Sequence, residues 1–217
     1  MKYSTIIFDL DGTLLDTSEG IMVGASYTAQ RMGISELTTD QQKSFIGPPI
    51  LESFIRECGL TKSEAEIAVS MYRERYQEKG LYEAKHYYKM EELLALLKKK
   101  GFKLAVATLK MDRFAKEILQ HFGLFHYFDS INGIDEKDTL SKKDIIQLCL
   151  KEIEEYDFSR VVLIGDSIFD AIGAKEAGID FIGVTYGFGF KAKEDIEQVG
   201  AIFTAESVKD IMGYLEV

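Results

Sequence analysis

The sequence predicts an α/β protein built on a doubly wound parallel sheet, with a small all-helical domain inserted after the first strand. Short apolar runs alternate with helix-length amphipathic segments through most of the chain, which is typical of parallel strands joined by right-handed crossovers. The first run, residues 3–8, lacks apolar and polar alternation, as expected for a central strand covered on both faces. Residues 16–82 contain no strand-like run. We therefore expect a core of residues 1–15 and 83–217 and a helical domain of residues 16–82.

Each further apolar run of the core predicts a strand, and each amphipathic run predicts a helix. Strands are expected at residues 102–107, 127–131, 160–165, 181–185 and 201–203. Core helices are expected at residues 90–100, 113–121, 141–154, from 166 toward 178, and at 206–215. In the inserted segment, helices are expected at residues 21–32, from 38 or 39, at 51–58 and at 63–80.

Composition excludes several classes of function. The 217-residue chain has a net charge of −10, which disfavours binding to nucleic acids because they are polyanions. We find no signal-like segment and no run of membrane-spanning length, and Cys58 and Cys149 lack metal-ligand spacing. We therefore expect a reduced cytoplasmic protein, a monomer or homodimer, with no membrane or nucleic-acid partner.

Two carboxylates follow the first expected strand, in the stretch Asp9-Leu10-Asp11-Gly12-Thr13. Ligands bind at the carboxyl ends of strands in open parallel sheets. Asp9 and Asp11 are one residue apart on an extended segment, so we expect their side chains on the same side. Two like charges this close repel unless a cation lies between them or one carboxylate is protonated. With Mg²⁺ present, Asp9 can ligate the metal and attack phosphorus. Asp11 can then protonate the leaving oxygen and later take a proton from water.

A second acidic pair follows the expected strand at residues 160–165. Asp166 lies at the strand end and Asp170 one helical turn further, so both can face one point and supply oxygen ligands to Mg²⁺. We expect Asp9, the Asp11 carbonyl and Asp166 to hold the metal, with Asp170 in support. The loop at residues 186–189 is expected at the same sheet edge, where it either lines the pocket or only turns the chain.

The string FDLDGTLLDT, residues 8–17, resembles the first signature of the haloacid dehalogenase superfamily in its phosphatase branch. Later motifs extend this resemblance over nearly the whole chain. The dehalogenases proper carry Tyr at the position of Asp11, whereas the phosphotransfer members carry Asp. The resemblance implies a Rossmann-like core, Mg²⁺ as cofactor, and a helical cap that closes over the active site. Within the family, the chain looks most like phosphoglycolate phosphatase.

The resemblance also implies two phosphate-binding residues. Thr108 matches the second motif, although Thr after a strand is by itself a common helix cap. Lys142 matches the third motif, a lysine that neutralises the phosphate and the nucleophile. A lysine at a helix start opposes the helix dipole, which a nearby anion would compensate. The family often has Lys-Pro at this point, whereas this chain has a second lysine, so Lys143 remains an alternative.

Gly47, Pro48 and Pro49 precede an expected helix and form a stiff loop whose amides could face a ligand. A plain helix start explains them equally well. In phosphatases similar to phosphoglycolate phosphatase, a comparable segment lies in the cap and faces the catalytic loop, so the resemblance favours contact with substrate. Candidate partners for a substrate carboxylate are Lys110, Lys43 and Arg56.

The function we expect is Mg²⁺-dependent hydrolysis of a small-molecule phosphate ester through an aspartyl-phosphate on Asp9. Alternatives are a 5′-nucleotidase or pyrophosphatase of the same family, a phosphomutase similar to β-phosphoglucomutase, and a non-catalytic binding module. Such phosphomutases typically carry His in the first cap helix, where this chain has Ile21. A degenerate binding module is expected to lose the nucleophile or the metal acids, which this chain retains. The physiological substrate is not determined by the sequence.

Overall fold

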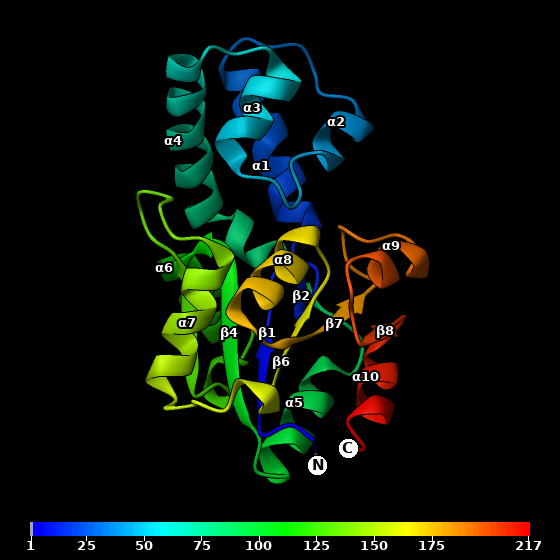
Figure 1. Ribbon diagram of the computed structural model, residues 1–217. Helices are drawn as coiled ribbons and strands as arrows, with labels where there is room; N and C mark the ends of the chain where they lie inside the picture. The colour runs from blue at the N-terminus through cyan, green and yellow to red at the C-terminus, as the bar shows by residue number, and fades with distance from the viewer. Residues whose placement is uncertain (1) are drawn as a thin grey trace. The chain divides into compact units, whose positions relative to one another are not determined.

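A six-stranded parallel sheet organises the larger part of the computed structural model, which describes residues 2–217 (Figure 1). The strand order is β5-β4-β1-β6-β7-β8. The bounds are β1 Thr5–Phe8, β4 Lys103–Met111, β5 Ser130–Ile134, β6 Val161–Gly165, β7 Asp180–Val184 and β8 Phe203–Ala205. This sheet confirms the predicted α/β class.

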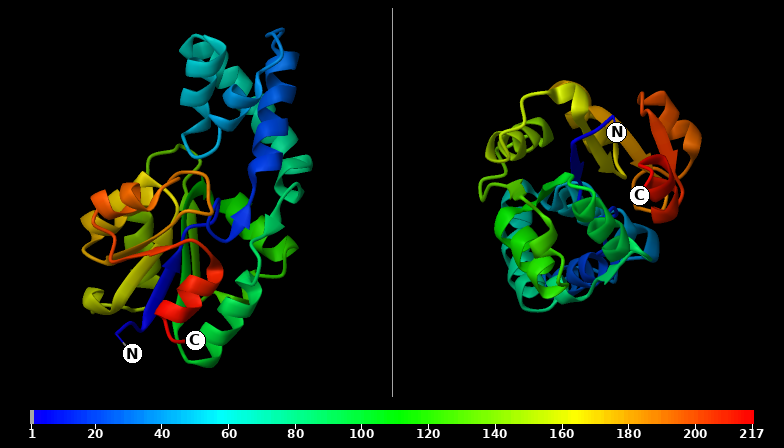
Figure 2. Two further views of the ribbon diagram at one scale, coloured as in Figure 1. Left: turned by 90° about the vertical axis from the view of Figure 1, so that its right-hand side faces the viewer. Right: turned by 90° about the horizontal axis from the view of Figure 1, so that it is seen from below.

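Helices cover both faces of the sheet (Figure 2, left panel), with α7, α8 and α9 on one side and α5 and α6 on the other. The core helices are α5 Met90–Lys99, α6 Asp112–His121, α7 Lys142–Glu152, α8 Ile168–Ala177, α9 Lys193–Gln198 and α10 Val208–Tyr214, with 3₁₀ turns η2 Phe125–Tyr127 and η3 Phe158–Arg160. Ile7, Ala105 and Leu163 on three adjacent strands pack against α7 and α8 in one buried cluster. The central strand is therefore buried on both faces, as its continuous apolar run predicts.

The chain divides into two units, Met1–Asp16 with His86–Val217, and Thr17–Lys85. The second unit contains α1 Ser18–Arg31, α2 Thr39–Lys43, α3 Ile50–Cys58, α4 Lys62–Glu78 and the 3₁₀ turn η1 Gly80–Tyr82. Two short strands, β2 Leu15–Asp16 and β3 Lys85–His86, pair where the chain passes between the units. The role of the helical unit as a cap stays a prediction.

Helix starts in the second unit follow from local capping. Thr38 and Gln41 form a capping box at α2, and Thr61 and Glu64 form another at α4, so two free amides at each helix start gain side-chain acceptors.

Gly24 on α1 faces Tyr72 on α4, where an added Cβ would lie 2.8 Å from the tyrosine ring. The glycine therefore lets these two helices approach closely.

Several element bounds differ from those expected. Strand β4 continues to Met111 instead of stopping at residue 107, with a register shift between Ala107 and Met111 where it pairs with β5. Thr108 and Lys110 thus lie inside the strand, and the Lys110 amide donates to the Thr108 hydroxyl at 3.1 Å. Strand β5 begins at Ser130 because residues 125–127 form a 3₁₀ turn. Helix α9 was not expected, since only one of its six residues is buried and no helical periodicity results.

Candidate active site

Three aspartates meet at the carboxyl edge of the sheet. Asp9 follows β1, Asp166 follows β6, and Asp170 lies in the first turn of α8. Each offers one carboxylate oxygen, and these oxygens lie within 4.8 Å of one another. Strands β1 and β6 are paired in parallel with Phe8 beside Ile164, so the residues that follow them emerge together. The aspartates are 7%, 3% and 1% exposed, respectively, which makes the cluster almost fully buried.

Lys142 neutralises part of this negative charge. Its Nζ lies 2.6 Å from Asp9 Oδ1 and 2.6 Å from Asp170 Oδ1. Burial alone lowers the pKa of Lys142, but the carboxylates of Asp170 and Asp9 outweigh burial and raise that pKa above its ordinary value. The amine therefore stays charged. Lys142 begins α7, which Ser141 caps, and Lys143 follows it in the first turn of the helix.

The charge balance of the cluster fits a divalent cation. Three carboxylates against one ammonium leave two negative charges in a buried volume. Burial, with the neighbouring aspartates, raises the pKa of Asp9 well above its ordinary value and the pKa of Asp166 to about 6. Carboxylate oxygens are the ligands that Mg²⁺ prefers. The residues present therefore suit Mg²⁺, and Asp9, Asp166 and Asp170 are the side chains that would hold it.

Asp170 is fixed by its own helix. Its Oδ2 accepts hydrogen bonds from the Ser167 amide at 3.0 Å and the Ser167 hydroxyl at 2.6 Å, which forms the capping box of α8. The other carboxylate oxygen, Oδ1, is the one that contacts Lys142. A Cβ at Gly165 would lie 2.5 Å from Asp170 Cγ, so only glycine fits at the end of β6. One carboxylate therefore caps a helix and orients the lysine.

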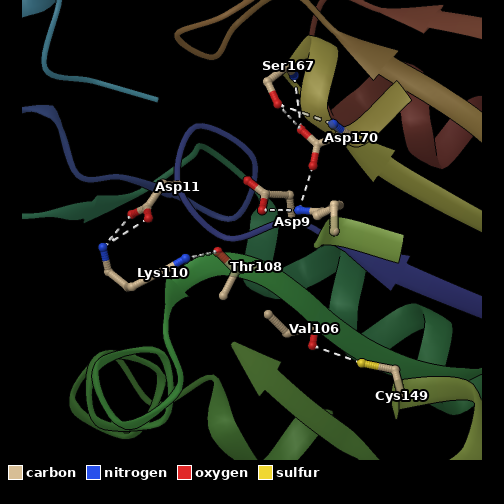
Figure 3. Close-up of polar contacts among 9 residues, drawn as sticks. Asp9, Asp11, Val106, Thr108, Lys110, Cys149, Ser167 and Asp170 are labelled. Carbon is tan, nitrogen blue, oxygen red and sulfur yellow. Dashed lines mark hydrogen bonds and ion pairs between the residues drawn. The ribbon is translucent and has the colours of Figure 1, made fainter. Parts of the chain in front are cut away.

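Asp11 contacts a different cation. Its two carboxylate oxygens lie 3.0 and 2.9 Å from Lys110 Nζ, and Figure 3 shows Asp11 turned to Lys110. Asp9 and Asp170 instead share the amine of Lys142. Thr108 precedes Lys110 on β4 and is 1% exposed. The cluster of three aspartates found in the described part of the chain does not include the Asp11 carboxylate. The Asp11 side chain contacts Lys110 instead.

The turn that carries Asp11 depends on Gly12. Its φ is +83°, a left-handed conformation that residues with a Cβ rarely adopt. A Cβ at Gly12 would collide with Asp166 Oδ2 and would lie 2.9 Å from the ring of Phe188. Gly12 therefore provides both the tight turn and the close approach of the Asp11 segment to Asp166.

The structure brings the predicted site residues into two neighbouring groups on the core. Asp9, Asp166, Asp170 and Lys142 form the first, and Asp11, Thr108 and Lys110 form the second. The remaining predicted residues, Gly47, Pro48 and Pro49, belong to the helical unit and lead into α3. Their contact with substrate stays a prediction.

Backbone donors to Asp166 are the contacts that sequence reasoning missed. Asp166 Oδ2 accepts hydrogen bonds from the amides of Phe188 at 2.6 Å and Gly189 at 3.0 Å. The only signal in the sequence is the pair of glycines in this loop, Gly187 and Gly189, and glycine spacing alone does not tell a turn from a site loop.

Comparison with known proteins agrees with this geometry. Residues 6–184 match the model of the haloacid dehalogenase-like hydrolase family, and the chain belongs to that family. A 5′-nucleotidase from Pseudomonas aeruginosa is 39% identical over 189 residues, which cover 87% of this chain and 86% of that protein. A phosphoglycolate phosphatase from Vibrio parahaemolyticus is 27% identical, with 98% and 96% of the two chains covered.

A solved structure supports the same assignment. A haloacid dehalogenase-like family hydrolase from Streptococcus pneumoniae superposes with a TM-score of 0.90 at 31% identity, over 99% of each chain. The chain is thus a hydrolase of this family with phosphatases among its relatives. Among the described residues, no helix has the length and apolar character needed to cross a membrane.

Proposed function

We propose that the chain is a Mg²⁺-dependent phosphatase that hydrolyses a small phosphomonoester through an aspartyl-phosphate on Asp9. The observation that carries this proposal is the buried carboxylate of Asp9, held by Lys142 at 2.6 Å within an acidic cluster suited to a divalent cation. Because Oδ1 of Asp9 is engaged by Lys142, we assign the attack on phosphorus to Oδ2.

The reaction proceeds in two displacements. Asp9 forms a bond to phosphorus as the bond to the leaving oxygen breaks, and protonated Asp11 gives that oxygen its proton. Water then attacks the aspartyl-phosphate, Asp11 takes the proton from water, and inorganic phosphate leaves with Asp9 regenerated. The contact with Lys110 Nζ orients the Asp11 carboxyl group for both proton transfers. Thr108 and Lys142 bind phosphoryl oxygens. A bound divalent cation would reduce the repulsion between the Asp9 carboxylate and the phosphate.

The substrate class is tested with a panel of phosphomonoesters and one phosphoanhydride. Phosphoglycolate, nucleoside 5′-monophosphates, sugar phosphates, pyrophosphate and an aryl phosphate are each assayed for phosphate release, with Mg²⁺ and with EDTA. We expect Mg²⁺-dependent turnover of at least one ester and none with EDTA. The 39% identity to a 5′-nucleotidase favours nucleoside 5′-monophosphates as a second candidate beside phosphoglycolate. No turnover of any compound by the folded protein with Mg²⁺ would refute the proposal.

Mg²⁺ is expected to stabilise the folded protein more at about pH 8 than at about pH 5. The pKa of Asp166 is raised to about 6 by burial, so the metal-free folded state holds a proton that the unfolded chain loses near pH 4. As the pH rises from about 4 to about 6, ionisation of Asp166 therefore lowers the free energy of unfolding of the metal-free protein. Binding of a cation to the ionised acids restores this stability. Thermal unfolding with and without Mg²⁺ at both pH values measures the difference. An equal shift at both values, or none, would contradict the metal assignment.

Gly173→Ala is expected to lower turnover roughly 10- to 100-fold by displacing Lys142. A Cβ at Gly173 on α8 would lie 2.5 Å from Lys142 Cγ and 2.8 Å from Lys142 Cβ. Gly213→Ala in α10 is the matched control, because no atom lies within 4 Å of an added Cβ there. The control should keep wild-type kinetics and gain about 0.5–1 kcal/mol of stability from the lower backbone entropy of alanine. Equal kinetics for the two variants would show that the packing of Gly173 does not position Lys142.

A further inference from the structure

The loop after β7 encloses Asp166. We refer to residues 186–190, Tyr186-Gly187-Phe188-Gly189-Phe190, as the tyrosine–glycine loop. The amides of Phe188 and Gly189 donate to Asp166 Oδ2, and the Phe190 amide donates to the Asp166 carbonyl at 2.8 Å. The loop therefore fixes both the side chain and the backbone of this aspartate.

The same loop contacts the turn that carries Asp11. A Cβ at Gly187 would collide with the carbonyl oxygen of Gly12 as well as with Asp166. The hydroxyl of Tyr186 donates a hydrogen bond of 3.2 Å to the carbonyl of Thr13. Within the turn, the Gly12 amide donates to Leu15. The tyrosine–glycine loop thus contacts both Asp166 and the residue 10–15 turn, which are more than 150 residues apart in the sequence. The Tyr186 hydroxyl bonds directly to the turn, through the carbonyl of Thr13.

We propose that Tyr186 is a positioning residue for the reaction. Its hydroxyl ties the residue 10–15 turn, which carries the general acid/base Asp11, to the loop that orients the metal-side carboxylate Asp166. The two functional groups then keep a fixed spacing. This inference rests on the function proposed above, because it assigns Tyr186 a role in aligning the groups of that reaction.

Tyr87 supplies a matched control. Its ring centroid lies 4.6 Å from that of Tyr186, at an interplanar angle of 56°. Its hydroxyl is buried and has no hydrogen-bond partner among the residues that the structure describes. Tyr87→Phe therefore removes a hydroxyl that bonds to nothing, whereas Tyr186→Phe removes one that holds Thr13. The two variants make the same chemical change in adjacent rings and differ in one hydrogen bond.

The test compares kcat, KM and Mg²⁺ affinity in the two variants. Loss of one hydrogen bond changes an equilibrium by a factor of about 3–10, so we expect Tyr186→Phe to lower kcat by about that factor with KM nearly unchanged. We expect its Mg²⁺ dissociation constant, measured by calorimetric titration without substrate, to rise by a similar factor. Hydrogen exchange at the amides of residues 10–15 should become faster. Tyr87→Phe should match wild type in all of these measurements.

Two outcomes would overturn the proposal. If Tyr186→Phe changed only the melting temperature, with kcat, Mg²⁺ affinity and exchange as in wild type, the hydroxyl would be structural alone. If Tyr87→Phe produced the same losses, ring packing and not the Thr13 hydrogen bond would explain them. Should the wild-type protein hydrolyse no phosphomonoester, the proposed function fails, while Mg²⁺ titration and hydrogen exchange still decide whether Tyr186 couples the two loops.

Discussion

Asp9→Asn is expected to lower turnover by at least about 10³-fold, because the amide cannot form the aspartyl-phosphate that the mechanism requires. The same change should leave the fold intact. Burial, with Asp170 and Asp166 nearby, raises the pKa of Asp9, so its ionised form is costly in the metal-free folded state. Replacing it with a neutral amide of similar shape should therefore keep or raise the melting temperature without Mg²⁺.

Turnover and thermal unfolding are measured on the same preparations, with and without Mg²⁺. The loss of one acid from the cluster should also reduce the stabilisation that Mg²⁺ gives. Asp180→Asn serves as the control, because Asp180 begins β7 and pairs with Lys2, away from the acidic cluster. Substantial residual activity in Asp9→Asn would remove Asp9 from the role of nucleophile.

Lys142→Met is expected to have the second largest effect, a loss of about 10²–10³-fold in turnover, the size seen when one preorganised donor to a reacting oxygen is removed. The substitution also leaves Asp9 and Asp170 without their shared counter-ion. Breaking a buried ion pair on one side typically costs about 3–5 kcal/mol, so the metal-free protein should be less stable. Mg²⁺ should restore part of this stability because it supplies positive charge to the same carboxylates.

Lys143→Met is the matched control for this variant. It removes the same charge one residue further along α7. We expect its kinetics and stability to stay close to wild type. If Lys143→Met lost activity and Lys142→Met did not, the phosphate lysine would be Lys143. Unfolding in urea and steady-state kinetics together distinguish a folding defect from a catalytic one.

The fold was predictable where burial leaves a continuous signal in the sequence. Strand β1 is β-branched or apolar at every position and buried on both faces, and this run without polar alternation places the strand in the sequence. The end of β4 was not predictable, because Thr108 and Lys110 are polar and their pattern is typical of a loop. In the structure they continue the strand past a register shift. Helix α9 gave no periodic pattern because Ile196 is its only buried residue.

The acidic cluster was predictable because strand ends that are adjacent in a parallel sheet bring their following residues together. The choice between Lys142 and Lys143 was not predictable, because both lie in the first turn of α7. Only the orientation of that helix brings Lys142 into contact with Asp9. The pairing of Asp11 with Lys110 depends on the late course of β4, which the sequence did not reveal. The amide donors to Asp166 carry no side-chain signature at all.

The most direct test of the mechanism is to trap the covalent intermediate. The protein is mixed with Mg²⁺ and a substrate that it turns over, quenched with acid, and treated with borohydride, which reduces an aspartyl-phosphate to homoserine. Peptide mass spectrometry then locates the reduced residue. We predict homoserine at position 9, dependent on substrate and absent from Asp9→Asn. Rapid turnover with no reduced residue, or with reduction at Asp11 instead, would contradict the assignment of Asp9 as the nucleophile.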